Sequence, residues 1–195
     1  MPHSSGVHQV RWRARFRFMN VATLSTQLQR GAAHPLLPGL AIAGLAFAIL
    51  AGAYAFEYLG GLKPCPLCLE QRGPWFVLIA AGGAIYSAGM AKAPRNIVMA
   101  LYVAALVIAL WSVYLGLYHA GVEYKWWPGP TSCTGGGLPL DGGLIGPISP
   151  SDIVWCDKIP WAMFGISLAG FNFLFSLVAA GLAALGLRTA LLEGR

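Results

Sequence analysis

The chain has 195 residues, of which 57% are hydrophobic and only 10% are charged. A soluble domain carries about 25% charged residues, so this composition excludes an ordinary soluble protein and indicates a membrane protein. The net charge of +6 would suit a nucleic-acid-binding protein. Its distribution fits the flanks of membrane spans instead, and no nucleic-acid partner is expected.

Four long apolar runs predict an all-α membrane protein, a bundle of four transmembrane helices. The runs are Leu36 to Tyr58, Trp75 to Met90, Ile97 to Tyr118 and Trp161 to Leu187. A spanning helix needs about 20 apolar residues, and the alternating pattern of a membrane barrel is absent from the sequence. We therefore place a membrane domain at residues 36–187, between a basic tail at 1–35 and a short tail at 188–195.

Basic residues indicate the orientation, because Lys and Arg gather on the cytoplasmic side of membrane proteins. With the N-terminus inside, nine of the 13 basic residues fall inside and only Lys63, Arg72, Lys125 and Lys158 fall outside. Both tails are then cytoplasmic, and the outer loops at about 59–73 and 120–160 carry all four cysteines. Disulfides form and persist on that side. The basic tail is either a disordered flank or an arm that contacts the anionic lipid of the bilayer.

The first run carries Gly44, Ala48 and Gly52 at four-residue spacing. Small residues at this spacing allow helices to pack closely in a bilayer. We expect this stripe to face a neighbouring helix.

Cys65 and Cys68 form a Cys-X-X-Cys motif at the mouth of the second run. Such a motif is half of a zinc site, a haem attachment or a redox dithiol. Haem attachment needs a His after the second Cys, where Leu69 stands. Zinc needs two further ligands close by, whereas the other two cysteines are single and distant, so no metal site is expected. The redox dithiol is the favoured interpretation.

Gly73 and Pro74 predict that the second membrane helix begins at Pro74 or Trp75, with residues 65–72 in a turn or a short interfacial helix. Arg72 follows Cys68 by four residues, which in a helical turn is the same face. A permanently charged guanidinium there would stabilise a Cys68 thiolate and donate to a carbonyl oxygen. The alternative is that Arg72 only anchors the chain at the interface.

The third run leads through His119 into a long outer segment that holds Cys133 and Cys156 within glycine-rich sequence. These two cysteines either staple an exposed loop or take part in thiol–disulfide exchange. A mobile surround favours exchange, because one disulfide must approach another. Residues 149–155 look like a short helix with Ser149 as its cap, which would deliver Cys156 at the membrane surface.

Four spans, Cys-Pro-Leu-Cys followed by Arg72, and a Cys133/Cys156 loop resemble the DsbB family over about residues 36–187. The resemblance implies a membrane enzyme, a quinone-dependent protein-disulfide oxidoreductase. It implies that Cys65 and Cys68 face the quinone, that Arg72 orients it, and that His119 lies near it. It also implies that Cys133 takes the mixed disulfide with the partner and that Cys156 resolves toward Cys65.

The family likeness further implies a location in the bacterial inner membrane with periplasmic cysteines. The implied partners are a DsbA-like thioredoxin-fold oxidase and the membrane quinone pool, with ubiquinone expected rather than menaquinone. Energetics agree, because a DsbA-like carrier has a potential of roughly −120 mV and its reoxidation needs a stronger acceptor. The sequence carries no flavin, haem or nucleotide motif.

Two other functions fit parts of the pattern. A vitamin K epoxide reductase type of thiol–quinone enzyme also has four spans, but there the quinone-facing cysteines follow the loop cysteines, and here they precede them. A non-enzymatic four-span protein would use its disulfides only as braces. The small, strained ring of a Cys-X-X-Cys disulfide is poorly suited to that purpose.

Overall fold

The computed structural model describes residues 36–131, 133–134 and 154–192. Four long helices make up nearly all of this part: α2 (Leu36–Tyr58), α3 (Pro66–Met90), α4 (Arg95–Glu123) and α5 (Leu168–Leu192). Each is long and apolar enough to cross a membrane. The predicted four-helix membrane fold is confirmed. The basic tail and residues 149–153 of the expected short helix lie outside the described residues, and the last two residues of that expectation, Val154 and Trp155, are not helical.

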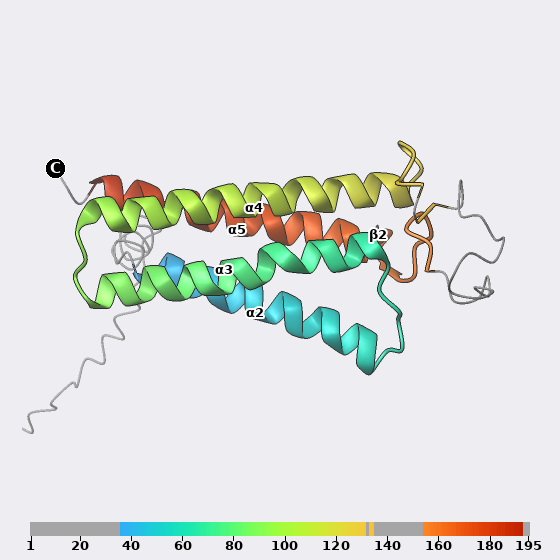
Figure 1. The fold of residues 1–195 in the computed structure, drawn as a ribbon, viewed down its shortest axis with the longest axis horizontal. Helices are drawn as coiled ribbons and strands as arrows, with labels where there is room; N and C mark the ends of the chain where they lie inside the picture. Colours follow the sequence, from blue (N-terminus) through green and yellow to red (C-terminus); the bar gives the residue numbers. More distant parts are fainter. Residues whose placement is uncertain (1–35, 132, 135–153, 193–195) are drawn as a thin grey trace, which may run out of the picture.

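The helices run side by side, and the connections that carry the cysteines lie together at one end of the bundle (Figure 1). The opposite end holds the α3–α4 connection and the C-terminal end of α5. The core is closed by large side chains that are at most 1% exposed, among them Ile42, Trp75, Leu78, Ile85 and Tyr102. Many apolar side chains point outward, as expected for helices that lipid surrounds.

The helix α3 begins at Pro66, so the prediction of a start at Pro74 or Trp75 was wrong. Pro66 occupies the first turn, where its missing N–H costs nothing, and Cys65 caps the helix with its side chain. Pro74 lies inside the helix and is buried. Contacts of the first two turns with α4 therefore outweigh the helix-breaking tendency of Gly73 and Pro74.

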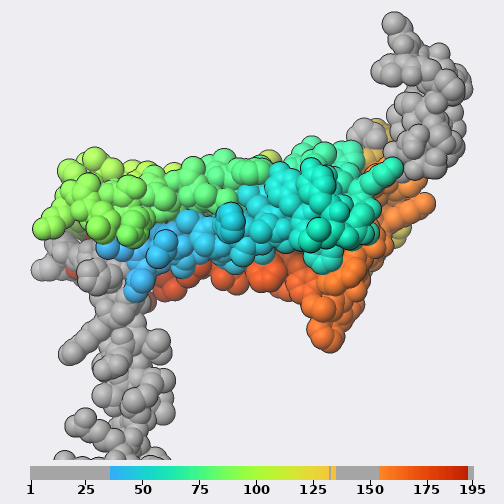
Figure 2. Space-filling model, turned by 90° about the horizontal axis from the view of Figure 1, so that it is seen from below, coloured from blue at the N-terminus to red at the C-terminus, as the bar shows by residue number. Residues whose placement is uncertain are grey.

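The fourth helix also differs from its predicted bounds. Residues 161–167 precede it, and they include an antiparallel hairpin of β1 (Ala162–Met163) and β2 (Ile166–Ser167). The hairpin turns through Phe164 and Gly165, both with positive φ. In Figure 2 the orange segment that includes it projects from the bundle beside the cyan outer end of α2. An apolar run alone does not distinguish this hairpin from the start of a helix.

Close packing of α2 on α3 uses other small residues than those predicted. A Cβ on Gly82 would lie 2.6 Å from the carbonyl oxygen of Gly39 and 2.8 Å from the Cβ of Ala43. By contrast, a Cβ on Gly44 or Gly52 would meet nothing within 4 Å. The two helices therefore touch through Gly39 and Gly82, and the expectation that the Gly44 stripe packs against a helix was wrong.

This difference predicts opposite effects for neighbouring glycines of α3. Gly82→Ala should lower the free energy of unfolding by about 1–3 kcal/mol, because the methyl group has to displace backbone. Gly83→Ala is the matched control, since its Cβ would enter open space, and the better helix former should leave stability equal or up to about 1 kcal/mol higher. Denaturant unfolding in detergent, followed by circular dichroism, measures both. Equal stability of the two variants would contradict this packing.

Candidate active site

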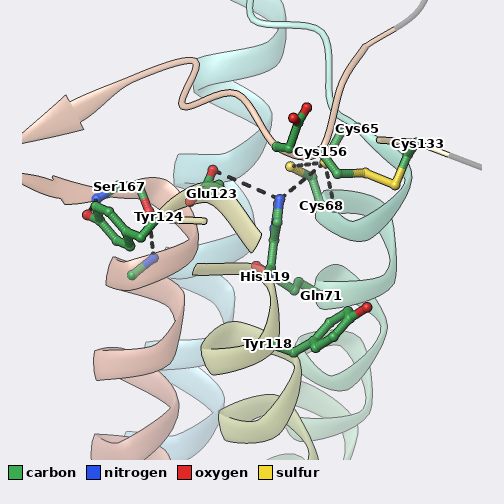
Figure 3. Close-up of polar contacts among 12 residues, drawn as sticks. Cys65, Cys68, Gln71, Tyr118, His119, Glu123, Tyr124, Cys133, Cys156 and Ser167 are labelled. Carbon is green, nitrogen blue, oxygen red and sulfur yellow. Dashed lines mark hydrogen bonds and ion pairs between the residues drawn. A yellow bond between two sulfur atoms is a disulfide. The ribbon is translucent and has the colours of Figure 1, made fainter. Parts of the chain in front are cut away.

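Cys65 and Cys68 lie at the start of α3, where the helix itself brings their sulfurs together (Figure 3). Cys65 is the N-cap residue, and its Sγ accepts a hydrogen bond of 3.2 Å from the backbone N–H of Cys68. The two Sγ atoms are 2.9 Å apart, and both cysteines are free. Cys65 is buried, whereas Cys68 is partly exposed. This arrangement suits a dithiol that closes to a disulfide without moving the backbone.

His119 on α4 faces the Cys65 sulfur, with its Nε2 3.5 Å from Sγ (Figure 3). Its other ring nitrogen, Nδ1, lies 2.8 Å from the side-chain nitrogen of Gln71, which also donates to the carbonyl oxygen of Leu115. Because the Gln71 amide donates to Nδ1, the proton of a neutral His119 ring sits on Nε2. The N–H of the imidazole therefore points at Cys65.

These donors favour the charged form of Cys65. Its pKa is lowered chiefly because the Cys68 thiol hydrogen-bonds to the thiolate, and further by the hydrogen bond and charge of His119. Burial acts in the opposite direction but is outweighed. A thiolate of low basicity is also a good leaving group in disulfide exchange.

Cys133 and Cys156 form a disulfide, with their Cα atoms 5.4 Å apart. The N–H of Cys156 donates to the carbonyl oxygen of Cys133, at 2.9 Å. Both residues are almost fully buried, and they belong to one apolar cluster with Cys65, Leu67 and Val122. The structure therefore brings the loop disulfide and the helix dithiol together at one end of the bundle.

Contacts with the end of α4 hold this disulfide in place. Lys125 donates to the backbone and to the carboxylate of Asp157, next to Cys156. That cation lowers the pKa of the Asp157 carboxyl. In the segment that leads to Cys133, the indole N–H of Trp127 donates to the carbonyl oxygen of Tyr118, at 2.9 Å. The described parts of the outer loop are thus fastened on both sides of the disulfide.

Arg72 does not point where the sequence predicted. Its guanidinium lies 2.6 Å from the carboxylate of Glu57 and 4.7 Å from the ring centre of Tyr54. The charged form of a thiol is favoured at Cys65, beside the Cys68 thiol and His119, rather than at Cys68 beside Arg72. Arg72 and Cys68 nevertheless both line the cavity described next.

A cavity of about 410 Å³ opens beside Cys68, between the outer ends of α2, α3 and α5. Its walls are mostly apolar, and its polar groups come from Lys63, Cys68, Gln71, Arg72 and Asn172. Trp75 separates it from the core and donates a 2.6 Å hydrogen bond to Asn172. Ala48 and Gly52 also line it, which shows where the small residues of α2 are used. An apolar cleft with a few convergent polar groups suits a small hydrophobic ligand.

The cluster also has the composition of a soft-metal site. Sulfur atoms of Cys65 and Cys68 and a ring nitrogen of His119 lie within 4.8 Å of one another. In the sequence no third zinc ligand was evident near the two cysteines, and in the fold His119 lies beside them. The 2.9 Å between the sulfurs is too short for both to bind one metal ion without moving.

The family described as disulfide bond formation protein DsbB matches residues 37–186. The chain belongs to the DsbB family. Disulfide bond formation protein B of Shewanella sp. (strain MR-4) is 29% identical over 144 residues, which cover 70% of this chain and 78% of that protein. The protein of the same name from Methylococcus capsulatus (strain ATCC 33009 / NCIMB 11132 / Bath) is 28% identical over 132 residues, 62% of this chain and 74% of that protein. No solved structure matches significantly.

DsbB-family membership, together with four helices that can span a membrane, makes the chain a multi-pass membrane oxidoreductase of disulfide-bond formation. The match decides against the vitamin K epoxide reductase type. It also decides against a protein whose disulfides serve only as braces.

Sequence reasoning missed three residues of this DsbB-family site. Gln71 holds the His119 ring, Glu57 holds Arg72, and Glu123 lies beside His119 with its side chain only 1% exposed. Gln71 follows Cys68 by three residues and Glu123 follows His119 by four, so helical spacing was the available signal. The Gln71 signal required a helix from Pro66 and the Glu123 signal required α4 to continue past Tyr118, and the sequence argument predicted neither, while Glu57 and Arg72 lie on different helices.

His119→Leu should raise the pKa of Cys65, because the thiolate loses one of its two side-chain donors and the charge of His119 while its burial remains. The thiolate absorbance of the reduced minus the oxidised protein, titrated with pH, measures this. Wild-type thiolate should persist to lower pH than thiolate in the variant. Tyr118→Phe, the matched neighbour, should titrate as wild type. A Cys65 titration that His119→Leu leaves unchanged would contradict the proposed contact.

Proposed function

We propose that this protein reoxidises a DsbA-like thioredoxin-fold dithiol carrier by disulfide exchange and passes the electrons to a membrane quinone. One observation carries the proposal: the Cys65–Cys68 pair lies between the buried Cys133–Cys156 disulfide and an apolar cavity. Cys65 packs against the disulfide, and Cys68 lines the cavity. A cysteine pair so placed can accept electrons from the loop cysteines on one side and pass them to an acceptor in the cavity on the other.

The exchange steps follow from the order of the sulfurs. A thiolate of the carrier attacks Cys133, which breaks the Cys133–Cys156 bond and frees Cys156 as a thiolate. Cys156 then attacks Cys65 of an oxidised Cys65–Cys68 pair, which frees Cys68. The second carrier thiolate releases Cys133, and Cys133 attacks Cys156 to reform the loop disulfide, with Cys65 as leaving group. The carrier ends oxidised and the Cys65–Cys68 pair reduced.

In the structure the loop disulfide is formed and the helix cysteines are free. The proposed exchange steps leave the protein in the same arrangement. A low Cys65 pKa favours its departure in the last exchange. A bound quinone would accept two electrons and two protons as the Cys65–Cys68 disulfide reforms. Cys68 is the cysteine that reaches the cavity, and Arg72, held by Glu57, is the donor placed there to orient a carbonyl oxygen.

Ubiquinone fits this role better than menaquinone, because it is the stronger oxidant and the carrier already has a potential of roughly −120 mV. We further propose that both termini are cytoplasmic and that the cysteine end of the bundle faces the periplasm of a bacterial inner membrane. The basic residues of the sequence support that orientation.

Cys133→Ser should abolish oxidation of the thioredoxin-fold carrier while leaving quinone reduction by a small dithiol measurable. The serine cannot form the mixed disulfide, but the Cys65–Cys68 pair and the cavity are intact. Carrier thiol loss and quinol formation are followed separately. Cys156→Ser serves as the matched control and should trap the carrier on Cys133. A carrier trapped on Cys65 in that variant would overturn the assignment.

Arg72→Met should raise the quinone Michaelis constant by about tenfold or more, because a hydrogen bond from a charged donor is worth roughly 1.5–3 kcal/mol. Steady-state turnover with a short-chain ubiquinone measures it. Lys63→Met removes the other cation that lines the cavity and is the control, since Lys63 is exposed and should matter little. An unchanged constant for Arg72→Met in a folded protein would make Arg72 an interface anchor only.

A further inference from the structure

Glu123 is a buried carboxylate that the surrounding protein satisfies only in part. It is the last residue of α4, where the helix dipole disfavours a negative charge. Its side chain is 1% exposed, and its Oε2 has no hydrogen-bond partner among the described residues. Burying an incompletely bonded carboxylate lowers the stability of the fold, so its presence suggests a functional role.

The groups that face Glu123 are those of the redox cluster. His119, one turn earlier on α4, places its Nε2 3.9 Å from Oε1. Cys65 and Cys68 approach from the start of α3, and both interact electrostatically with the carboxylate. Ser167 of β2 lies on the remaining side, where its hydroxyl hydrogen-bonds to the Glu123 carboxylate and its N–H donates to the Tyr124 hydroxyl.

No lysine or arginine of the described part of the chain is among the groups that act on Glu123. Arg72 pairs with Glu57, and Lys125 pairs with Asp157. A Cys65 thiolate and a Glu123 carboxylate would thus be two buried anions on either side of one imidazole. Like charges in a dry site do not both stay ionised, so the cluster shares a proton among its members.

We infer that Glu123 holds the proton that Cys65 gives up, and that it receives this proton through His119. The inference rests on the proposed function. His119 Nε2–H passes its proton to a Glu123 oxygen, and the vacated Nε2 takes the proton of the Cys65 thiol. Cys65 becomes a thiolate, Glu123 becomes a neutral carboxylic acid, and His119 ends neutral as it began. Gln71 keeps the ring in the required tautomer by donating to Nδ1.

Glu123 thereby acts on the sulfur without touching it. When the Cys65–Cys68 disulfide reforms, the stored proton is free to leave for the quinol or for water. The carboxylate is then restored, so the reduced and the oxidised protein each hold one buried anion here, the Cys65 thiolate in the first and the Glu123 carboxylate in the second. A neutral acid at this place also removes the cost of the unpaired Oε2 while the thiolate is present.

Infrared difference spectroscopy of the reduced minus the oxidised full-length protein tests this directly. Reduction by a small dithiol, with no quinone added, should produce a C=O band of a protonated carboxyl. Glu123→Gln should abolish that band. Glu70→Gln is the matched control, because Glu70 is an exposed carboxylate on the same helix as the cysteines, and it should keep the band. Glu123→Asp should keep a shifted band and so tests the idea even if Glu123→Gln does not fold.

Turnover gives a second readout. Glu123→Gln should slow quinone reduction at neutral pH by about 10- to 100-fold, the range in which proton transfer by a positioned side chain acts. The difference in rate between the variant and the wild type should become smaller as the pH rises, because hydroxide then removes the thiol proton. Glu70→Gln should follow the wild-type profile. A wild-type protein that reduces quinone but shows no carboxyl band would overturn the inference and leave the proposed function standing. A band without any quinone reduction would overturn the proposed function instead.

Discussion

The Cys65 sulfur caps the helix on which its redox partner stands, and the rest of the site depends on that hydrogen bond. Because Sγ accepts the N–H of Cys68, the helix α3 begins at Pro66 and the two sulfurs meet in its first turn. The next turn then places Gln71 toward α4 and Arg72 toward α2. A thiolate is a better acceptor than a thiol, so reduction strengthens the cap while it creates the reactive group.

The two cysteines have different surroundings although they are three residues apart. Cys65 is buried among Val122, the loop disulfide and His119, where polar groups stabilise charge and exchange occurs between sulfurs. Cys68 lines an apolar cavity with Trp75. One turn of helix therefore separates the side that exchanges disulfides from the side that meets the lipid-soluble acceptor. The Glu57 carboxylate balances the charge of Arg72 there, so the cavity gains a donor without an unpaired buried charge.

Sequence alone was enough for the parts of this protein that depend on composition and spacing. The four apolar runs became four helices, and the four cysteines came together in one cluster. What it missed depends on contacts between helices. The early start of α3 rests on the Cys65 cap and on bonds from Gln71 to Leu115 and His119, which together outweigh Gly73 and Pro74. The ion pair of Arg72 with Glu57 joins two helices through residues 15 positions apart, and no local sequence pattern predicts it. For the same reason, nothing in the spacing of residues distinguished Gly39 and Gly82, which touch, from Gly44 and Gly52, which do not.

The cavity itself follows from how α2 leans on α3. At the inner end the two backbones meet through Gly39 and Gly82, where even a methyl group has no room. Toward the outer end α2 diverges from α3 in Figure 1. There Ala48 and Gly52 put no large side chain into the space that opens, and Trp161 and Phe171 close it from the side of α5. The two helices are thus in close contact at the inner end and separate toward the outer end, where the cavity lies beside Cys68. A larger residue at the inner contact would spread the helices along their whole length, so the packing far from the sulfurs determines the size of the space beside them.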